Sequence, residues 1–236
     1  YLFSASSGTF TAITDGTPVA TSTSVADFLG DIKTSTPIPI GFDFVYLGVT
    51  YTQLRAMSDG YISFNLSATT AGSNNLATSA ATQLLAPLWD DLDGASGSGA
   101  ANYKTEGEAG SRVFTIEWIN WQWNYSASGA TISFQVKLYE TSGKIEFIYR
   151  EEAGAVNLGS ASIGITAIAT GSGNYLSLNG TGDAPTASST TETINLSTKP
   201  ATGQVYTFTP APPKAIDAGV TAIVAPISGA TGMHNV

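Results

Sequence analysis

Three closely spaced carboxylates are the first candidates for chemistry in this sequence. Asp90, Asp91 and Asp93 follow the apolar run Leu84–Trp89 and precede Gly94. Calcium takes several oxygen ligands, and neighbouring carboxylates beside a glycine turn can supply them. We therefore expect Asp90, Asp91 and Asp93 to be calcium ligands, although the full pattern of an EF-hand loop is absent. The alternative is a structural turn in which an aspartate accepts hydrogen bonds from backbone N–H groups.

A second candidate group is aromatic. Trp121, Trp123 and Tyr125 alternate along the chain and would share one face of a regular strand, whereas Trp118 falls on the opposite parity. Exposed together, Trp121, Trp123 and Tyr125 would bind a sugar ring or a partner protein, because large rings contribute much contact area at low entropic cost. The alternative is core packing, with a bulge near Asn120 that re-aims the strand.

Catalytic chemistry has little support in the residue types. The sole histidine is His234 and there is no cysteine, which excludes triads that use either residue from residues 1–209. No phosphate loop, zinc motif or dinucleotide fingerprint is present. The glutamates fall mostly in turns or at outward positions of strands. We expect the protein not to be an enzyme.

The composition narrows the class of partner. The formal net charge is −9, which argues against nucleic acid or anionic lipid as a partner. Charged residues make up only 11% of the chain, and serine, threonine, glycine and alanine are abundant, as is typical of extracellular bacterial β proteins. The sequence opens with Tyr1 and contains no apolar stretch long enough to cross a membrane. We expect the processed form of an exported protein, secreted or held at the cell surface.

Short alternating segments predict the fold. Residues 38–46 alternate strictly between apolar and other side chains, as do residues 132–138 and 145–149 on either side of a turn. Gly143 stands where that hairpin turn needs a positive φ. No long amphipathic helix is present, so we expect an all-β chain folded as an antiparallel, jelly-roll-like β-sandwich. Matching parity predicts one shared core made of Phe42, Phe44, Ile62, Phe64, Leu85, Trp89, Phe134, Val136 and Phe147.

Three segments together resemble a known family. Residues 57–64 form a turn and strand, residues 85–93 read Leu-Ala-Pro-Leu-Trp-Asp-Asp-Leu-Asp, and residues 132–149 form a Phe-Gln strand and a glycine hairpin. Their order and spacing resemble the nidogen-type extracellular domain, with Leu88 where that family often has an aromatic residue. Similar domains stand at the N-terminus of large surface proteins of gliding bacteria that use type IX secretion. Those domains also open on a Tyr-x-Phe strand and a Gly-Thr turn, as residues 1–9 do.

The resemblance implies a non-catalytic recognition or adhesion module of a larger cell-surface protein, with a glycan or protein as its partner and no insertion into the membrane. Two alternatives stay open: a structural subunit of a surface fibre or coat, and an accessory binding domain of a secreted hydrolase.

The end of the chain predicts a second unit. Residues 1–209 form the main domain, residues 210–214 are a Pro-rich linker, and residues 217–226 read as one more strand. A lone strand is not stable in water, so it needs a sheet to join. The resemblance implies that residues 215–236 begin an Ig-like domain. The alternative is that the strand joins the sheet of a neighbouring subunit.

Overall fold

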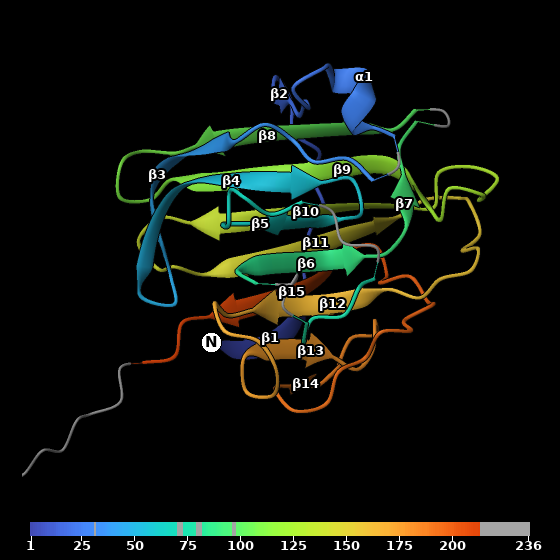
Figure 1. Ribbon diagram of the computed structural model, residues 1–236. Coiled ribbons are helices and arrows are strands. Elements are labelled where there is room, and N and C mark those ends of the chain that lie inside the picture. Colours follow the sequence, from blue (N-terminus) through green and yellow to red (C-terminus); the bar gives the residue numbers. More distant parts are fainter. Residues whose placement is uncertain (31, 70–72, 79–81, 96–97, 213–236) are drawn as a thin grey trace, which may run out of the picture.

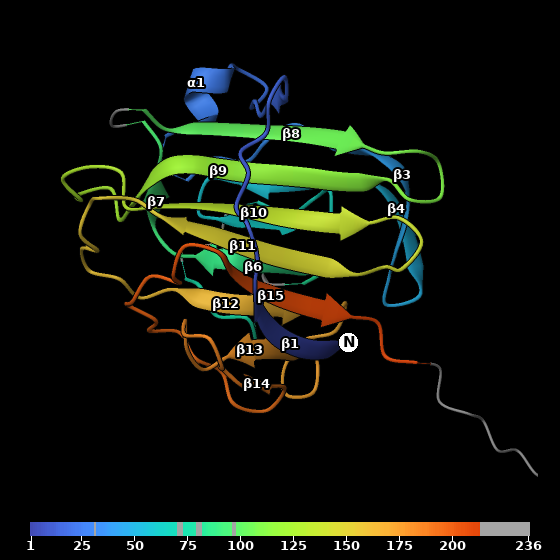
Figure 2. The same cartoon turned by 180° about the vertical axis from the view of Figure 1, so that it is seen from behind.

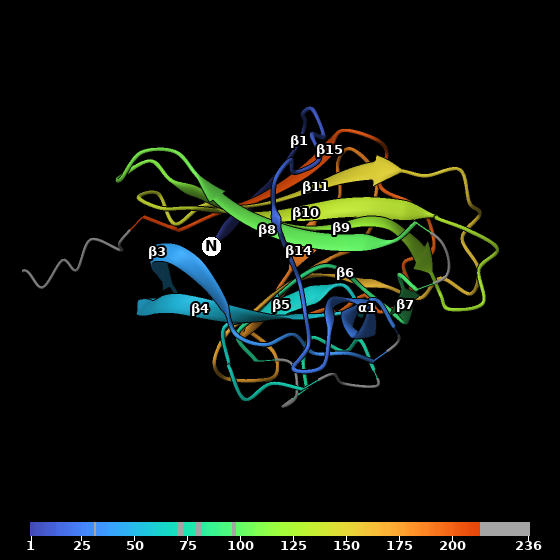
Figure 3. The same ribbon diagram turned by 90° about the horizontal axis from the view of Figure 1, so that it is seen from above.

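The computed structural model describes residues 1–30, 32–69, 73–78, 82–95 and 98–212. Within them two antiparallel sheets pack face to face, and the view along the layers separates the two sheets clearly (Figure 3). The predicted antiparallel β-sandwich is confirmed. The predicted strand at 217–226 and the last two residues of the linker lie outside the described residues.

The first sheet contains, in spatial order, β1 (Leu2–Ser7), β15 (Gln204–Thr209), β11 (Ile145–Glu151), β10 (Ile132–Tyr139), β9 (Val113–Trp123), β8 (Ala100–Glu106) and β2 (Thr17–Pro18), with β7 (Leu92–Asp93) paired to β9 (Figure 1). The second contains β14 (Ala187–Ser188), β13 (Tyr175–Leu178), β12 (Ser162–Thr166), β6 (Leu84–Trp89), β5 (Tyr61–Ser63), β4 (Val49–Met57) and β3 (Ile38–Tyr46). The short helix α1 (Val25–Phe28) lies beside β8 and β2. No helix among the described residues has the length and apolar character needed to cross a bilayer.

Alternating burial builds the core between the sheets. In β3 every second residue is buried and the residues between them are exposed, as the period-two pattern predicts. All of the predicted core residues except Trp89 belong to one buried cluster shared by both sheets. Phe134 stacks on Trp118 in that cluster, with ring centroids 5.0 Å apart.

The placement of Trp89 in this core was wrong, and a bulge in β6 is the reason. Ala86 lies opposite Gly164 and Trp89 lies opposite Ser162, so β6 has one residue more than β12 over this stretch. An extra residue reverses the side on which the following side chains emerge. Trp89 therefore packs in a separate cluster, with its ring centroid 4.7 Å from that of Tyr61.

A second bulge, in β9, confirms the alternative considered for the tryptophans. Trp118 pairs with Phe134 and Trp121 pairs with Ile132, so β9 carries one extra residue there. Asn120 sits in this stretch with φ 55°, in the left-handed region. The bulge lets tryptophans of opposite parity on one strand reach the same core.

Both ends of the main domain lie at one end of the sandwich. Leu2 pairs with Thr209, so the first strand starts beside the point where the last strand ends (Figure 2). The turn between β10 and β11 is at this end too, since the Tyr1 hydroxyl donates to the Gly143 carbonyl at 3.1 Å. Gly143 has φ 62°, as the hairpin predicted.

Candidate functional site

The acidic cluster has a structural role at Asp90. Its side chain is buried, and Oδ2 accepts hydrogen bonds from Trp123 Nε1 and from Ser160 N, both at 2.6 Å. Oδ1 accepts from the Ser160 hydroxyl and from Asp91 N, both at 2.9 Å. Asp93 Oδ1 accepts from Ala95 N at 2.6 Å. These contacts match the alternative of aspartates that satisfy backbone N–H groups.

The three aspartate side chains do not form one cluster in the structure. Within the described part of the chain no group of three or more carboxylate, histidine or cysteine side chains could hold a metal ion. Asp90, Asp91 and Asp93 all belong to that part, so the structure does not gather their carboxylates into such a group, and calcium binding at this turn stays a prediction. The physical reason for the separation is that the Asp90 carboxylate is directed to Trp123 and Ser160.

The predicted aromatic binding surface is also wrong for two of its three members. Trp121 and Trp123 are fully buried, and only Tyr125 is exposed, at 60%. Trp121 Nε1 donates to the Ala100 carbonyl at 2.9 Å, so the polar edge of this indole is satisfied inside the protein. Because of the bulge at Asn120, neither indole presents a ring face to solvent.

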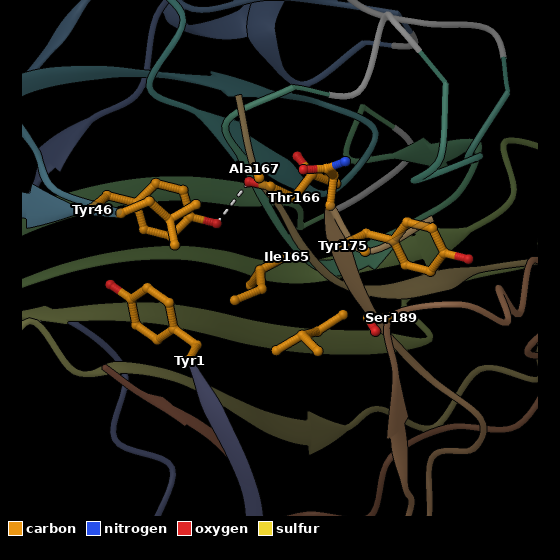
Figure 4. A pocket seen from close by; sticks show the side chains of 11 residues that line it. Tyr1, Tyr46, Ile165, Thr166, Ala167, Tyr175 and Ser189 are labelled. Atoms are coloured by element: carbon orange, nitrogen blue, oxygen red, sulfur yellow. Dashed lines mark hydrogen bonds between the residues drawn. The ribbon is translucent and has the colours of Figure 1, made fainter. Parts of the chain in front are cut away.

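A different group of aromatic and hydroxyl side chains surrounds a hollow at the Tyr1 end of the sandwich. This tyrosine hollow has a volume of about 220 Å³ and is lined by residues that include Tyr1, Tyr46, Ile165, Thr166, Tyr175 and Ser189. They come from the chain start, the end of β3, the end of β12, the start of β13 and the residue after β14. Figure 4 shows Tyr1 and Tyr46 on one side, Tyr175 and Ser189 on the other, and Ile165 between them.

Hydrogen bonds and ring packing hold this hollow in shape. The Tyr46 hydroxyl donates to the Thr166 carbonyl at 2.8 Å, which joins β3 to β12 (Figure 4). The Thr166 hydroxyl accepts from Leu84 N at 3.1 Å. Tyr1 packs on Tyr46 with ring centroids 5.4 Å apart. The hollow is therefore set by strands of the scaffold.

The side chains that line the tyrosine hollow are uncharged at neutral pH. Burial raises the pKa of Tyr46 well above its usual range, with nearby Tyr1 and Tyr51 adding to the effect. Burial also raises the pKa of Tyr1. Both phenols therefore keep their protons at neutral pH, and none of the residues lining the hollow has a charged side chain. Rings with hydroxyl and amide groups around them suit a neutral, hydroxyl-bearing ligand.

A second hollow adjoins the first. It has a volume of about 450 Å³ and shares Tyr1 and Leu47 with the tyrosine hollow. Its other walls include the β3–β4 turn, the β10–β11 turn, and Pro210 and Ala211, where the chain leaves the domain. We call it the exit hollow.

The sequence did not point to these residues as a site. Tyr1, Tyr46, Thr166 and Ser189 lie far apart in the chain and match no motif, so only the fold brings them together. The only sequence pattern at these residues was the alternation of residues 38–46, which ends at Tyr46. It predicted that Tyr46 is buried but not which residues surround it.

Comparison with known proteins identifies the family to which this arrangement belongs. A family model described as NIDO related matches residues 1–210. The chain belongs to this family. The match covers every described strand from β1 to β15, so both hollows are built on the NIDO-related domain. No curated protein and no solved structure matches the chain significantly.

The family supports part of what the sequence predicted. A NIDO-related domain is an extracellular type of module, in agreement with the resemblance to nidogen-type domains. The route of export and the partner stay predictions.

Proposed function

We propose that this NIDO-related domain is a non-catalytic recognition or adhesion module of a larger cell-surface protein exported by type IX secretion. It binds an extracellular glycan or surface protein through the tyrosine hollow. The observation that carries this proposal is the hollow itself, where Tyr1 and residues of the second sheet and its loops surround a depression whose side chains carry no charge.

A neutral glycan is the partner that these features favour. A hollow of about 220 Å³ lies below the usual range for drug-sized ligands, roughly 300–1,000 Å³, and suits a single sugar ring. Tyr46 and Tyr175 are buried, but Tyr1 is partly exposed and offers apolar ring surface to the C–H groups of a sugar, and Asn174 and Ser189 can exchange hydrogen bonds with its hydroxyls. The lining side chains offer no charge to pair with an acidic ligand.

The test measures binding of the full chain to an array of neutral and acidic glycans. We expect neutral glycans to bind, and Ser189→Arg to weaken that binding by about tenfold or more, because a long cation then occupies the hollow. Ser128→Arg is the matched control. Ser128 is exposed in the β9–β10 loop, at the opposite end of the sandwich, and its replacement should leave the affinity unchanged.

Two results would contradict the proposal in different ways. Glycan binding that survives Ser189→Arg would remove the tyrosine hollow from the binding site. An array that binds nothing would exclude the glycan, and a surface protein whose binding is lost in Ser189→Arg would then be the partner.

A further inference from the structure

Two exposed aliphatic side chains of the turn between β3 and β4, Val45 and Leu47, line the exit hollow, and a third, Val49, follows the turn on the other face of the hairpin. Val45, Leu47 and Val49 are 49%, 45% and 39% exposed. Val45 and Leu47 line the exit hollow together with Pro210 and Ala211. An apolar rim therefore borders the path by which the chain leaves the domain.

The backbone at Leu47 makes this rim unusual. Leu47 has φ 51° and is followed by Gly48 with φ 81°, so an apolar residue occupies a left-handed position in a tight turn. Asparagine, aspartate and glycine are the residues that such a turn prefers, and leucine there costs conformational energy. Leu47 is 45% exposed, so its own domain covers only part of this side chain.

The exit hollow has no unbalanced charge to oppose an apolar occupant. Its carboxylate, Glu140, pairs with Arg112 at 2.5 Å, and Oε2 also accepts from Gly110 N and Arg112 N. The Tyr1 hydroxyl and the Gly143 carbonyl satisfy each other across the hollow's wall.

The chain that follows has the matching character. Residues 215–226 contain four β-branched aliphatic residues, Ile216, Val220, Ile223 and Val224, and a single charge, Asp217. From Ala211 to Ala215 the linker spans at most about 12 Å in the extended form that prolines favour, at about 3.1 Å per residue. The segment therefore starts within reach of the apolar rim.

We propose that residues 215–226 of the same chain dock in the exit hollow against Val45 and Leu47, with Val49 beside the hollow as a position for a label. A short linker holds such a segment near the exit hollow at an effective concentration on the order of mM. With an intrinsic dissociation constant about ten times lower than this concentration, docked molecules outnumber undocked ones about ten to one. Docking fixes the direction in which the chain continues from the NIDO-related domain. The docked segment also covers Tyr1 and Leu47, which line both hollows.

The absence of cysteine makes the test direct. A nitroxide attached to Val49→Cys is the only label in the full chain, and it should broaden the amide NMR signals of residues 219–224. Adding Leu47→Asn should weaken docking about tenfold, which takes the ratio of docked to undocked molecules from about ten to one to about one to one and roughly halves the broadening, while the turn itself is relieved of strain and the melting temperature does not fall.

Leu158→Asn is the matched control for Leu47→Asn. Leu158 is also an exposed leucine with a positive φ, 49°, but it lies in the β11–β12 loop at the opposite end of the sandwich. Its replacement should leave the broadening intact. Signals of residues 219–224 that are unaffected by the label at Val49 would overturn the proposal. Broadening that appears only when labelled and unlabelled chains are mixed would also overturn it, because the exit hollow would then bind the strand of a neighbouring copy.

Discussion

At the residue scale, Asp90 shows how a carboxylate that suggests metal binding can serve the scaffold. Its partners Trp123 and Ser160 are distant in the sequence, and the sequence around Asp90 does not reveal them. A buried carboxylate with four donors around it is stabilised as an acceptor. The spacing of the aspartates predicted the turn but not the direction of this side chain.

Asp90→Asn is predicted to destabilise the domain by about 1–3 kcal/mol. The donors that the Asp90 carboxylate accepts from belong to Trp123, Ser160 and Asp91. The asparagine amide keeps one acceptor oxygen, but its NH₂ group faces two of these donors and cannot accept from them. Urea unfolding measures the change. Asp183→Asn, at an exposed position, is the control and should alter the free energy of unfolding little.

Calcium provides a second check at the same residue. Because both Asp90 oxygens already accept protein donors, added calcium should leave the melting temperature of the unmodified protein unchanged. A rise that is lost in Asp90→Asn would return this residue to the role of a metal ligand.

At the scale of elements, alternation predicted the strands well and the bulges poorly. The period-two pattern located β3, β10 and β11, because each buries one face in a sandwich. It misplaced Trp89 and left two alternatives for Trp121, because one extra residue in β6 or β9 reverses the parity. A bulge is defined by the partner strand, so the pattern of a single strand contains no direct record of it.

The β10–β11 hairpin carries a pH prediction. Hydrogen bonds from the Arg112 side chain, with further ones from Arg112 N and Gly110 N, lower the pKa of Glu140 to about 2 from its usual 4.5. A carboxyl whose folded pKa is depressed stabilises the fold above the unfolded pKa and loses that contribution as the pH falls through the folded value. The stabilisation should therefore be complete at pH 7 and disappear between about pH 4.5 and pH 2.

Thermal melts of Glu140→Gln and the unmodified chain test this hairpin. The variant should melt at a lower temperature at pH 7, and the gap should close as the pH falls toward 2.5, on the order of the pKa of Glu140. Glu151→Gln, at an exposed position that ends β11, should melt like the unmodified chain throughout. A Glu140→Gln gap that is the same at both pH values would show that the ion pair does not set the pH dependence.

At the scale of the whole molecule, the sequence predicted the fold and the family but not the candidate site. Class and strand pattern depend on local alternation, which a sequence displays directly. The tyrosine hollow depends on where β3, β12 and β13 end relative to Tyr1, and these ends are set by pairing between distant segments. The conspicuous tryptophans and aspartates proved to be parts of the core and of a turn.

The most direct test of the proposed recognition role is hydrogen–deuterium exchange of the full chain with and without a neutral glycan selected on the array. The account predicts slower exchange at the chain start and in residues 165–176, around the tyrosine hollow, and no change in the β9–β10 loop that contains Tyr125. Protection confined to the β9–β10 loop, with none around Tyr1 and Thr166, would contradict the central claim.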